Sequence, residues 1–248
     1  MDPRAPRRRP SRSAARPAWQ SPVLLVTLAA IAIGLGIVVL ANRPTASPVG
    51  ELLAPPTSYT ADLVDGDVLG SPSAPVVMEL YADFQCPACK LLVTTELPRL
   101  WTDFIQPGTL RIEARDVDIL GSGNPDESLE LAAGAACAAE QRRYWQFHDY
   151  VFWNQGRENK GDHSPEFIAR VADAAGVDLT AWQECFARDD VRSTVRQDTT
   201  VATGKGVNQT PTLVLNGTSL VGVPDYDQLA ARIRELAGGS PAPTASPS

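Results

Sequence analysis

The stretch Phe84-Gln85-Cys86-Pro87-Ala88-Cys89-Lys90 places two cysteines three positions apart. A mostly apolar run of strand length, residues 75–81, precedes it, and the residues after it predict a helix to about residue 104, bent near Pro98. Two cysteines with this spacing lie on one face of a helix, close enough to bond to each other. The stretch therefore predicts a strand, a helix and a cysteine pair at their junction.

The place of Cys86 at the start of a helix favours its thiolate form. Unpaired backbone N–H groups and the positive end of the helix dipole lie there. Pro87 suits the first turn, because it has no N–H to leave unpaired. Thiol exchange needs one thiolate that attacks and a second thiol that resolves the mixed disulfide. We predict that Cys86 is the exposed nucleophile and Cys89 the shielded resolving thiol.

Two other interpretations of the cysteine pair are a zinc site and a purely structural disulfide. A zinc site needs two further cysteine or histidine ligands at compatible spacing. The other candidates in the chain contain no second tight pair; they are Cys137, Cys185, His148 and His163. Because a cysteine pair between a strand and a helix is more specific than the spacing alone, we favour redox chemistry, with no metal and no bound cofactor.

The rest of the chain predicts an α/β order around this junction. Residues 110–115 alternate in polarity and predict a second strand. A long helical region follows, with helices expected at 126–153, from 165 onward, at 178–187 and at 191–203. Asn216-Gly217 is a strong hairpin signal between short strands at 212–215 and 219–221. Residues 225–236 predict a closing helix.

Two segments resemble those of DsbA-like thioredoxin-fold proteins of the membrane-anchored bacterial type. Residues 83–89 are similar to the active-site segment of that family, and residues 207–213, Val-Asn-Gln-Thr-Pro-Thr-Leu, resemble its cis-proline loop. The helical region between them resembles the family's inserted helical domain. The resemblance covers about residues 67–236. It implies an α/β thioredoxin fold over residues 59–237, with a helical insertion at about 120–205.

The resemblance also implies roles for the loop residues. Pro211 is expected after a cis peptide bond, a form that X–Pro bonds adopt at low cost. The backbone of Thr210 is expected to pair with an extended substrate segment next to Cys86. Pro87 and Ala88 complete the active-site loop. An ordinary trans proline is the alternative for Pro211.

Two positions depart from the family's pattern. Family members often have a buried acid six residues before the first cysteine, where this chain has Leu80, with Glu79 one residue earlier. One step along a strand reverses the side to which a side chain points, so Glu79 is only a candidate for the acid that transfers a proton. Strongly oxidising members tend to have histidine where this chain has Ala88. Without that cation we expect a milder redox potential.

A second cysteine pair, Cys137 and Cys185, lies far apart in the sequence in contexts that look buried. We predict that it forms a structural disulfide, since such bonds persist outside the cytoplasm. Closing so long a loop would stabilise the fold by about 4 kcal/mol in the chain-entropy model. The alternatives are two separate buried thiols and a second redox relay.

The first 58 residues predict a membrane tether. Residues 23–41 carry no charge and as a helix would span about 28 Å, close to the hydrocarbon thickness of a bilayer. Basic residues 1–22 precede them, which by the positive-inside rule places the N-terminus in the cytoplasm. A signal peptide cleaved after Val39-Leu40-Ala41 is the alternative. Residues 42–58, with four prolines, are expected to be a linker, and residues 238–248 a disordered tail.

Charge and compartment suggest the partners. The chain has a net charge of −7, and residues 1–42 hold six Arg and one Asp, so the remainder carries −12. Such an acidic domain argues against nucleic acid as a partner. We expect exported proteins with cysteines as substrates and, by the resemblance, a DsbB-like or VKOR-like membrane partner. We expect an extracytoplasmic oxidase; a reductase or isomerase of the same fold and a non-catalytic anchored binding module stay open.

Overall fold

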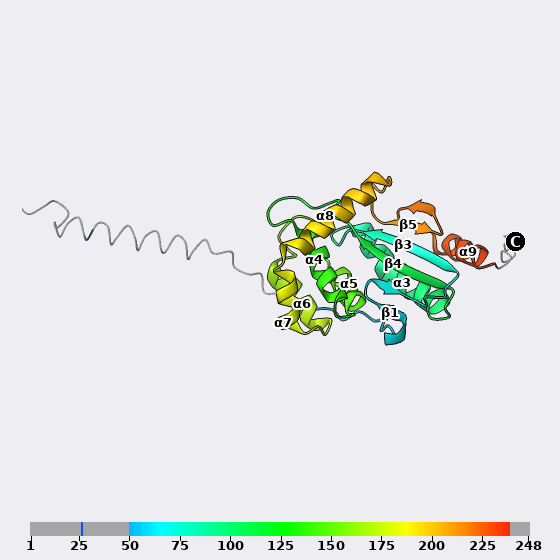
Figure 1. Ribbon diagram of the computed structural model, residues 1–248, viewed down its shortest axis with the longest axis horizontal. Helices are drawn as coiled ribbons and strands as arrows, with labels where there is room; N and C mark the ends of the chain where they lie inside the picture. Colours follow the sequence, from blue (N-terminus) through cyan, green and yellow to red (C-terminus); the bar gives the residue numbers. More distant parts are fainter. Residues whose placement is uncertain (1–25, 27–49, 239–248) are drawn as a thin grey trace, which may run out of the picture. The chain divides into compact units, whose positions relative to one another are not determined.

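The computed structural model describes Val26 and residues 50–238 of the 248-residue chain (Figure 1). Several of the predicted segments lie outside these residues: the basic tail, nearly all of the transmembrane helix, the start of the linker and the C-terminal tail after Gly238. Within the described part of the chain, no helix combines the length and the apolar character needed to span a bilayer.

A mixed sheet lies at the centre of the folded part. Its order is β1 (Val64–Asp65), β2 (Val68–Leu69), β4 (Leu110–Asp116), β3 (Val76–Ala82), β5 (Thr212–Leu215) and β6 (Thr218–Val221). Strands β3 and β4 are parallel, and every other neighbouring pair is antiparallel. The strands predicted from residue 75 onward are confirmed with bounds shifted by a single residue. The hairpin of β1 and β2 was not predicted, because two-residue strands leave almost no alternation to detect.

One run of helical turns follows β3 and carries the cysteine pair. It comprises α2 (Pro87–Leu91), the π-helical turn η3 (Leu92–Glu96), α3 (Leu97–Leu100) and the π-helical turn η4 (Trp101–Ile105). The predicted helix is confirmed, and π turns flank Pro98. Proline has no N–H to donate, and its ring crowds the carbonyl four residues earlier; a widened turn accommodates both effects. We call this run, residues 87–105, the redox helix.

Helices α4 (Glu127–Ala139), α5 (Tyr144–Trp153), α6 (Pro165–Ala174), α7 (Leu179–Phe186) and α8 (Asp189–Gly204) lie between β4 and β5. Figure 1 shows them gathered beside the sheet, and we call them the insert. Asp126, Ser164 and Asp178 cap three of the helices with their side chains, as expected from residue types that favour caps. The helical region predicted at 126–153 is confirmed, but it is not continuous. It breaks between α4 and α5, where Arg142 has a left-handed φ of 59°.

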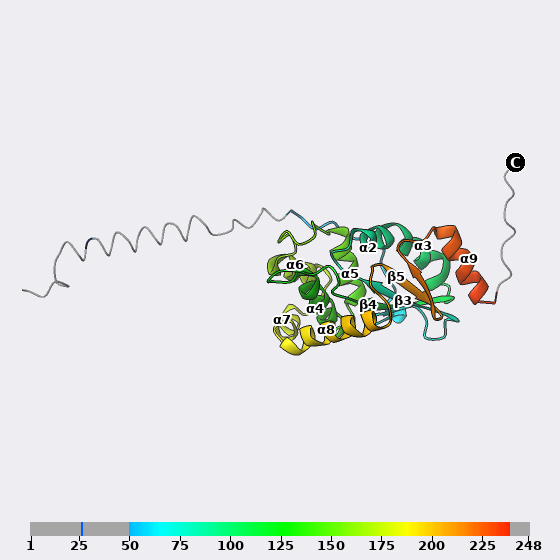
Figure 2. The same cartoon turned by 90° about the horizontal axis from the view of Figure 1, so that it is seen from above.

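The last helix, α9 (Tyr226–Leu236), packs beside the redox helix. The guanidinium of Arg99 lies 3.4 Å from the ring centroid of Tyr226, and Arg234 lies 5.2 Å from that of Phe104. Figure 2 shows α2, α3 and α9 on one side of the strands and α8 toward the other. A continuous apolar core joins sheet, redox helix and insert. The insert is therefore fused to the sheet rather than hinged from it.

Part of the expected linker is bound to the fold. Residues 50–60 precede a short 3-10 turn, η2 (Ala61–Leu63), and lie against the insert. The side-chain amide of Asn154 pairs with both the N–H and the C=O of Leu53, at 2.7 and 2.9 Å. The expectation of a free spacer over the whole of 42–58 is therefore revised, because a partner lying 101 residues further along holds its second half.

Candidate functional site

The cysteine pair lies at the carboxyl end of β3, where the redox helix begins. Cys86 is the residue before the first helical turn and has an extended backbone, with Pro87 in the first turn of α2. Both Cys86 and Cys89 are free thiols. Cys89 is fully buried, whereas 6% of Cys86 is exposed. Cys86 is thus the more accessible of the two, but it is far less exposed than the sequence led us to expect.

The loop 207–211 contacts Cys86. The Thr210–Pro211 peptide bond is cis, and the Sγ of Cys86 donates a hydrogen bond of 3.2 Å to the carbonyl oxygen of Thr210. Strand β5 follows this loop and pairs with β3, with Thr212 opposite Tyr81. That pairing brings the loop to the end of β3, although the two segments are far apart in the sequence.

The electrostatics of the two thiols differ sharply. A hydrogen bond from Cys89 contributes most to lowering the pKa of Cys86 from 9.0 to about 6. Hydrogen bonds from the Thr210 side chain and from the backbone N–H groups of Cys89 and Ala88 also lower it, while burial opposes them. Burial raises the pKa of Cys89 well above its ordinary value, and the neighbouring Cys86 raises it further. At neutral pH the pair is therefore a thiolate at Cys86 beside a protonated thiol at Cys89.

Asp83 anchors the turn that leads into Cys86. Its buried carboxylate accepts hydrogen bonds from the N–H of Gln85 at 2.9 Å and the hydroxyl of Ser128 at 2.7 Å. Its other oxygen accepts from the N–H groups of Ile119 and Leu120, at 3.0 and 2.9 Å. Burial raises its pKa in spite of these four donors. Asp83 belongs to the quoted motif, and an acid at the end of an apolar strand was the signal that could have singled it out.

Two glutamines connect the turn to the insert. The amide of Gln155 donates to the carbonyl oxygens of Phe84 and Cys86, at 2.7 and 3.0 Å. Gln85 donates to Ser128 at 2.8 Å and accepts from the N–H of Asn159 at 2.7 Å. Sequence analysis missed both contacts, because each joins segments that only the tertiary fold brings together.

Glu79 lies away from the cysteine pair. Its carboxylate is 3.5 Å from the Nε of Arg115 and accepts a hydrogen bond of 3.4 Å from the hydroxyl of Tyr81. Leu80, the next residue, is buried in the core instead. Among the described contacts, none joins Glu79 to Cys86 or Cys89. The one-residue offset along β3 accounts for this placement, so the structure lends no support to Glu79 as the acid that transfers a proton.

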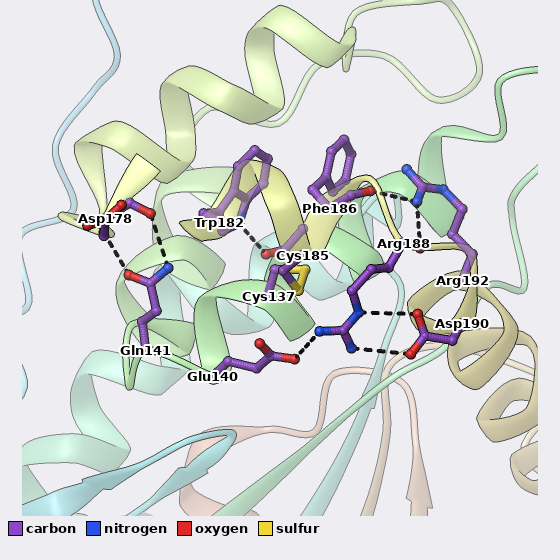
Figure 3. Close-up of a disulfide and its surroundings, with 11 residues drawn as sticks. Cys137, Glu140, Gln141, Asp178, Trp182, Cys185, Phe186, Arg188, Asp190 and Arg192 are labelled. Carbon is purple, nitrogen blue, oxygen red and sulfur yellow. Dashed lines mark hydrogen bonds and ion pairs between the residues drawn. A yellow bond between two sulfur atoms is a disulfide. The ribbon is translucent and has the colours of Figure 1, made fainter. Parts of the chain in front are cut away.

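Cys137 and Cys185 are joined by a disulfide that ties α4 to α7 (Figure 3). The indole N–H of Trp182 donates to the carbonyl of Gly134 beside it, at 2.9 Å. Only glycine fits at 134, since a Cβ there would lie 2.8 Å from the ring of Phe147. This bond belongs to the core of the insert and shares no contact with Cys86 or Cys89 among the described residues.

The other residues considered as zinc ligands have different partners. The Nδ1 of His148 lies 2.8 Å from the carboxylate of Asp149, and that of His163 lies 2.7 Å from Glu127. Within the described residues, no group of three or more histidine, cysteine, aspartate or glutamate side chains is placed to hold a metal ion. The geometry at Cys86 and Cys89 is that of a dithiol.

A large cavity, of about 650 Å³, lies between α8, α4 and β4. Asp116 and Tyr144 are among its lining residues, and burial raises the pKa of Asp116 to about 8. Neither Cys86 nor Cys89 lines it, and no residue of 207–211 does. It is therefore separate from the candidate redox site.

Known proteins share this fold. A family model described as thioredoxin matches residues 63–235. A probable disulfide bond formation protein D of Bacillus anthracis is 27% identical over 168 residues, which cover 66% of this chain and 75% of that protein. The oxidised crystal structure of Bacillus subtilis BdbD has a TM-score of 0.62 at 21% identity, covering 77% of this chain and 100% of the other. Oxidised Mycobacterium tuberculosis DsbA has a TM-score of 0.60 at 26% identity, with coverages of 72% and 93%.

Proposed function

Since the chain belongs to the thioredoxin family and is a DsbA-like protein disulfide oxidoreductase, we propose that it uses Cys86 and Cys89 to form disulfides in exported proteins. The observation that carries this proposal is the contrast between the two thiols. The pKa of Cys86 is lowered to about 6, and that of Cys89 is raised. A stable thiolate at Cys86 favours the reduced enzyme, and an enzyme that is stable when reduced is an oxidant.

The oxidase cycle begins with a disulfide between Cys86 and Cys89. A substrate thiolate attacks the Sγ of Cys86, the bond between the two enzyme sulfurs breaks, and Cys89 leaves with the electron pair and takes up a proton. A second substrate thiolate then attacks the substrate sulfur in the mixed disulfide. Cys86 leaves as a thiolate, and its low pKa makes it a good leaving group. The substrate dithiol is oxidised and the enzyme is reduced by two electrons.

The loop 207–211 is proposed to hold the substrate during this exchange. The carbonyl oxygen of Thr210 lies 3.2 Å from the Sγ of Cys86 in the free enzyme, so that backbone lies within reach of anything bonded to Cys86. An extended substrate segment would pair with it in the manner of an added strand. Pro211, Pro87 and Ala88 shape the site around the mixed disulfide.

The proposed setting is outside the cytoplasm, with the domain tethered to the cell membrane by residues 23–41. A buried disulfide between Cys137 and Cys185 suits an oxidising compartment. Turnover requires reoxidation of Cys86 and Cys89 by another disulfide or a quinone. A DsbB-like or VKOR-like membrane protein is proposed to supply it.

A reductase is the second candidate, and Ala88 is the observation that favours it. A cation at this position would lower the pKa of Cys86 further. At about 6, this pKa lies between values of about 7 and about 3.5 that are typical of thioredoxin and DsbA. We therefore expect a reduction potential between about −270 and about −120 mV.

The test is to equilibrate the full-length protein in glutathione buffers and measure the potential of the cysteine pair, with Cys86→Ser and Cys89→Ser as controls. A potential above about −200 mV supports the oxidase. A potential near about −270 mV supports the reductase. A pair that never exchanges with glutathione would rule out Cys86 and Cys89 as the redox pair.

A further inference from the structure

Residues 50–59, which we call the strap, precede the region that matches the thioredoxin family, which begins at residue 63. They contain no helix or strand, yet they are held against the insert at both ends. The strap therefore lies outside the region that the family model matches.

Asn154 holds the middle of the strap. Its side-chain amide accepts from the N–H of Leu53 at 2.7 Å and donates to the carbonyl of Leu53 at 2.9 Å. The same amide donates to the carbonyl of Tyr150 at 2.8 Å, which ties it to the last turn of α5. Further along, Arg170 of α6 donates to the carbonyl of Gly50 at 3.1 Å.

Tyr59 holds the other end and connects the insert with the redox helix. Its hydroxyl donates to the carboxylate of Asp149 in α5 at 2.7 Å. Its ring packs edge-on against two tryptophans. The distance between ring centroids is 5.0 Å to Trp101 of the redox helix and 6.1 Å to Trp145 of α5. One side chain of the strap thus contacts both structures that surround the cysteine pair.

Gln155, the residue after Asn154, contacts the turn around Cys86 and not the strap. Its side-chain amide donates to the backbone carbonyls of Phe84 and Cys86. The backbone carbonyl of Gln155 accepts a hydrogen bond of 3.4 Å from the ammonium of Lys90. The carbonyl of Cys86 is also the first acceptor of α2, from the N–H of Lys90. Two adjacent residues therefore hold the strap on one side and the turn around Cys86 on the other.

We infer that the strap is a positioning element of the redox site: it fixes the corner at Asn154 and Gln155, and Gln155 fixes the backbone of Cys86. The inference rests on the proposed role of Cys86 as the nucleophile. When the corner is free to move, the N–H groups of Ala88 and Cys89 lose their alignment with the sulfur of Cys86. The thiolate is then less well stabilised.

The experiment titrates the Cys86 thiolate in the reduced full-length protein by its ultraviolet absorbance, alongside the melting temperature. The variants are Asn154→Ala, Tyr59→Phe and Gln155→Met. Gln141→Ala is a matched control, because the amide of Gln141 holds both backbone groups of Asp178 in the same two-bond manner, as Figure 3 shows. Gln141 has no described contact with the turn around Cys86.

We expect Asn154→Ala and Gln155→Met to raise the pKa of Cys86, and Tyr59→Phe to raise it less. A rise of one unit would lower the thiolate fraction at pH 6 about fivefold. Gln141→Ala should lower the melting temperature and leave the titration unchanged. If Asn154→Ala and Tyr59→Phe lower only the melting temperature, as the control does, the strap is merely structural and the inference is overturned.

The result of this titration can be distinguished from the result that tests the proposed function. The titration reports on Cys86 whether or not it turns over substrate. Persistent disulfide exchange in Cys86→Ser would refute the proposed function. An unchanged titration in the strap variants would refute only the positioning role.

Discussion

At the scale of single residues, the pKa of Cys86 dictates how the reduced protein responds to acid. Folding lowers that pKa from 9.0 to about 6, so the folded state binds fewer protons than the unfolded state between these values. The resulting stabilisation is present at alkaline pH and is lost as the pH falls through 6. We expect the free energy of unfolding of the reduced protein to drop by about 1.4 kcal/mol between pH 7 and pH 5 from this group alone.

The comparison of wild type with Cys86→Ser isolates this contribution, because every other titrating group is common to both. Denaturant unfolding of both reduced proteins at pH 5, 6 and 7 would measure it. Equal pH slopes for the two proteins would mean that Cys86 is not a stabilised thiolate. The oxidised wild type should also lack the extra slope, since a disulfide has no thiol to titrate.

Asp83 is the residue on which the geometry of the turn depends most. Four groups donate hydrogen bonds to its carboxylate, two to each oxygen, so both oxygens must be acceptors. In Asp83→Asn, an amide NH₂ replaces one oxygen and faces a backbone N–H, which leaves at least one buried donor without a partner. We expect a loss of about 1–3 kcal/mol in the free energy of unfolding, measured by denaturant titration. Ser128→Ala removes two hydrogen bonds, the one that Ser128 donates to Asp83 and the one that it accepts from Gln85, but it brings no two donors face to face and should cost less. The reverse order would contradict this account.

At the scale of elements, the disulfide between Cys137 and Cys185 joins α4 to α7 across 48 residues. The free energy of unfolding of the double variant Cys137→Ser/Cys185→Ser should be about 4 kcal/mol lower than that of the wild type, because the unfolded chain regains the entropy of an open loop. Its reduction potential at Cys86 and Cys89 should match that of the wild type. Loss of thiol exchange in a variant that still folds would instead point to a redox relay through the second pair.

Local signals in the sequence predicted most of these elements. Ser164-Pro165 and Asp178 mark helix starts through cap chemistry, and Asn216-Gly217 marks a hairpin, so their positions depend on neighbours in the chain. The break between α4 and α5 was missed, because Arg142 adopts a left-handed backbone without a glycine to announce it. The π turns were also missed, since a proline marks an irregular helix without specifying how the turns adjust.

At the scale of the whole molecule, the sequence indicated which residues meet at the site but not what holds them there. Cys86 and Cys89 follow from spacing, and Thr210 and Pro211 from the resemblance of the loop around them; the structure brings all four together. Gln155 and Asn154 carried no recognisable pattern. Their roles depend on packing between segments about 70 and 101 residues away, which no local rule encodes.

The contact between Cys86 and Thr210 also has a consequence for biosynthesis. The hydrogen bond between them spans 124 residues, and it requires β5 to be paired with β3. A chain that leaves the ribosome N-terminus first presents both cysteines of the pair long before the loop 207–211 exists. Contacts of such high sequence separation also form late in folding. The newly made protein thus lacks the contribution of Thr210 to the low pKa of Cys86 until the last strands close the sheet.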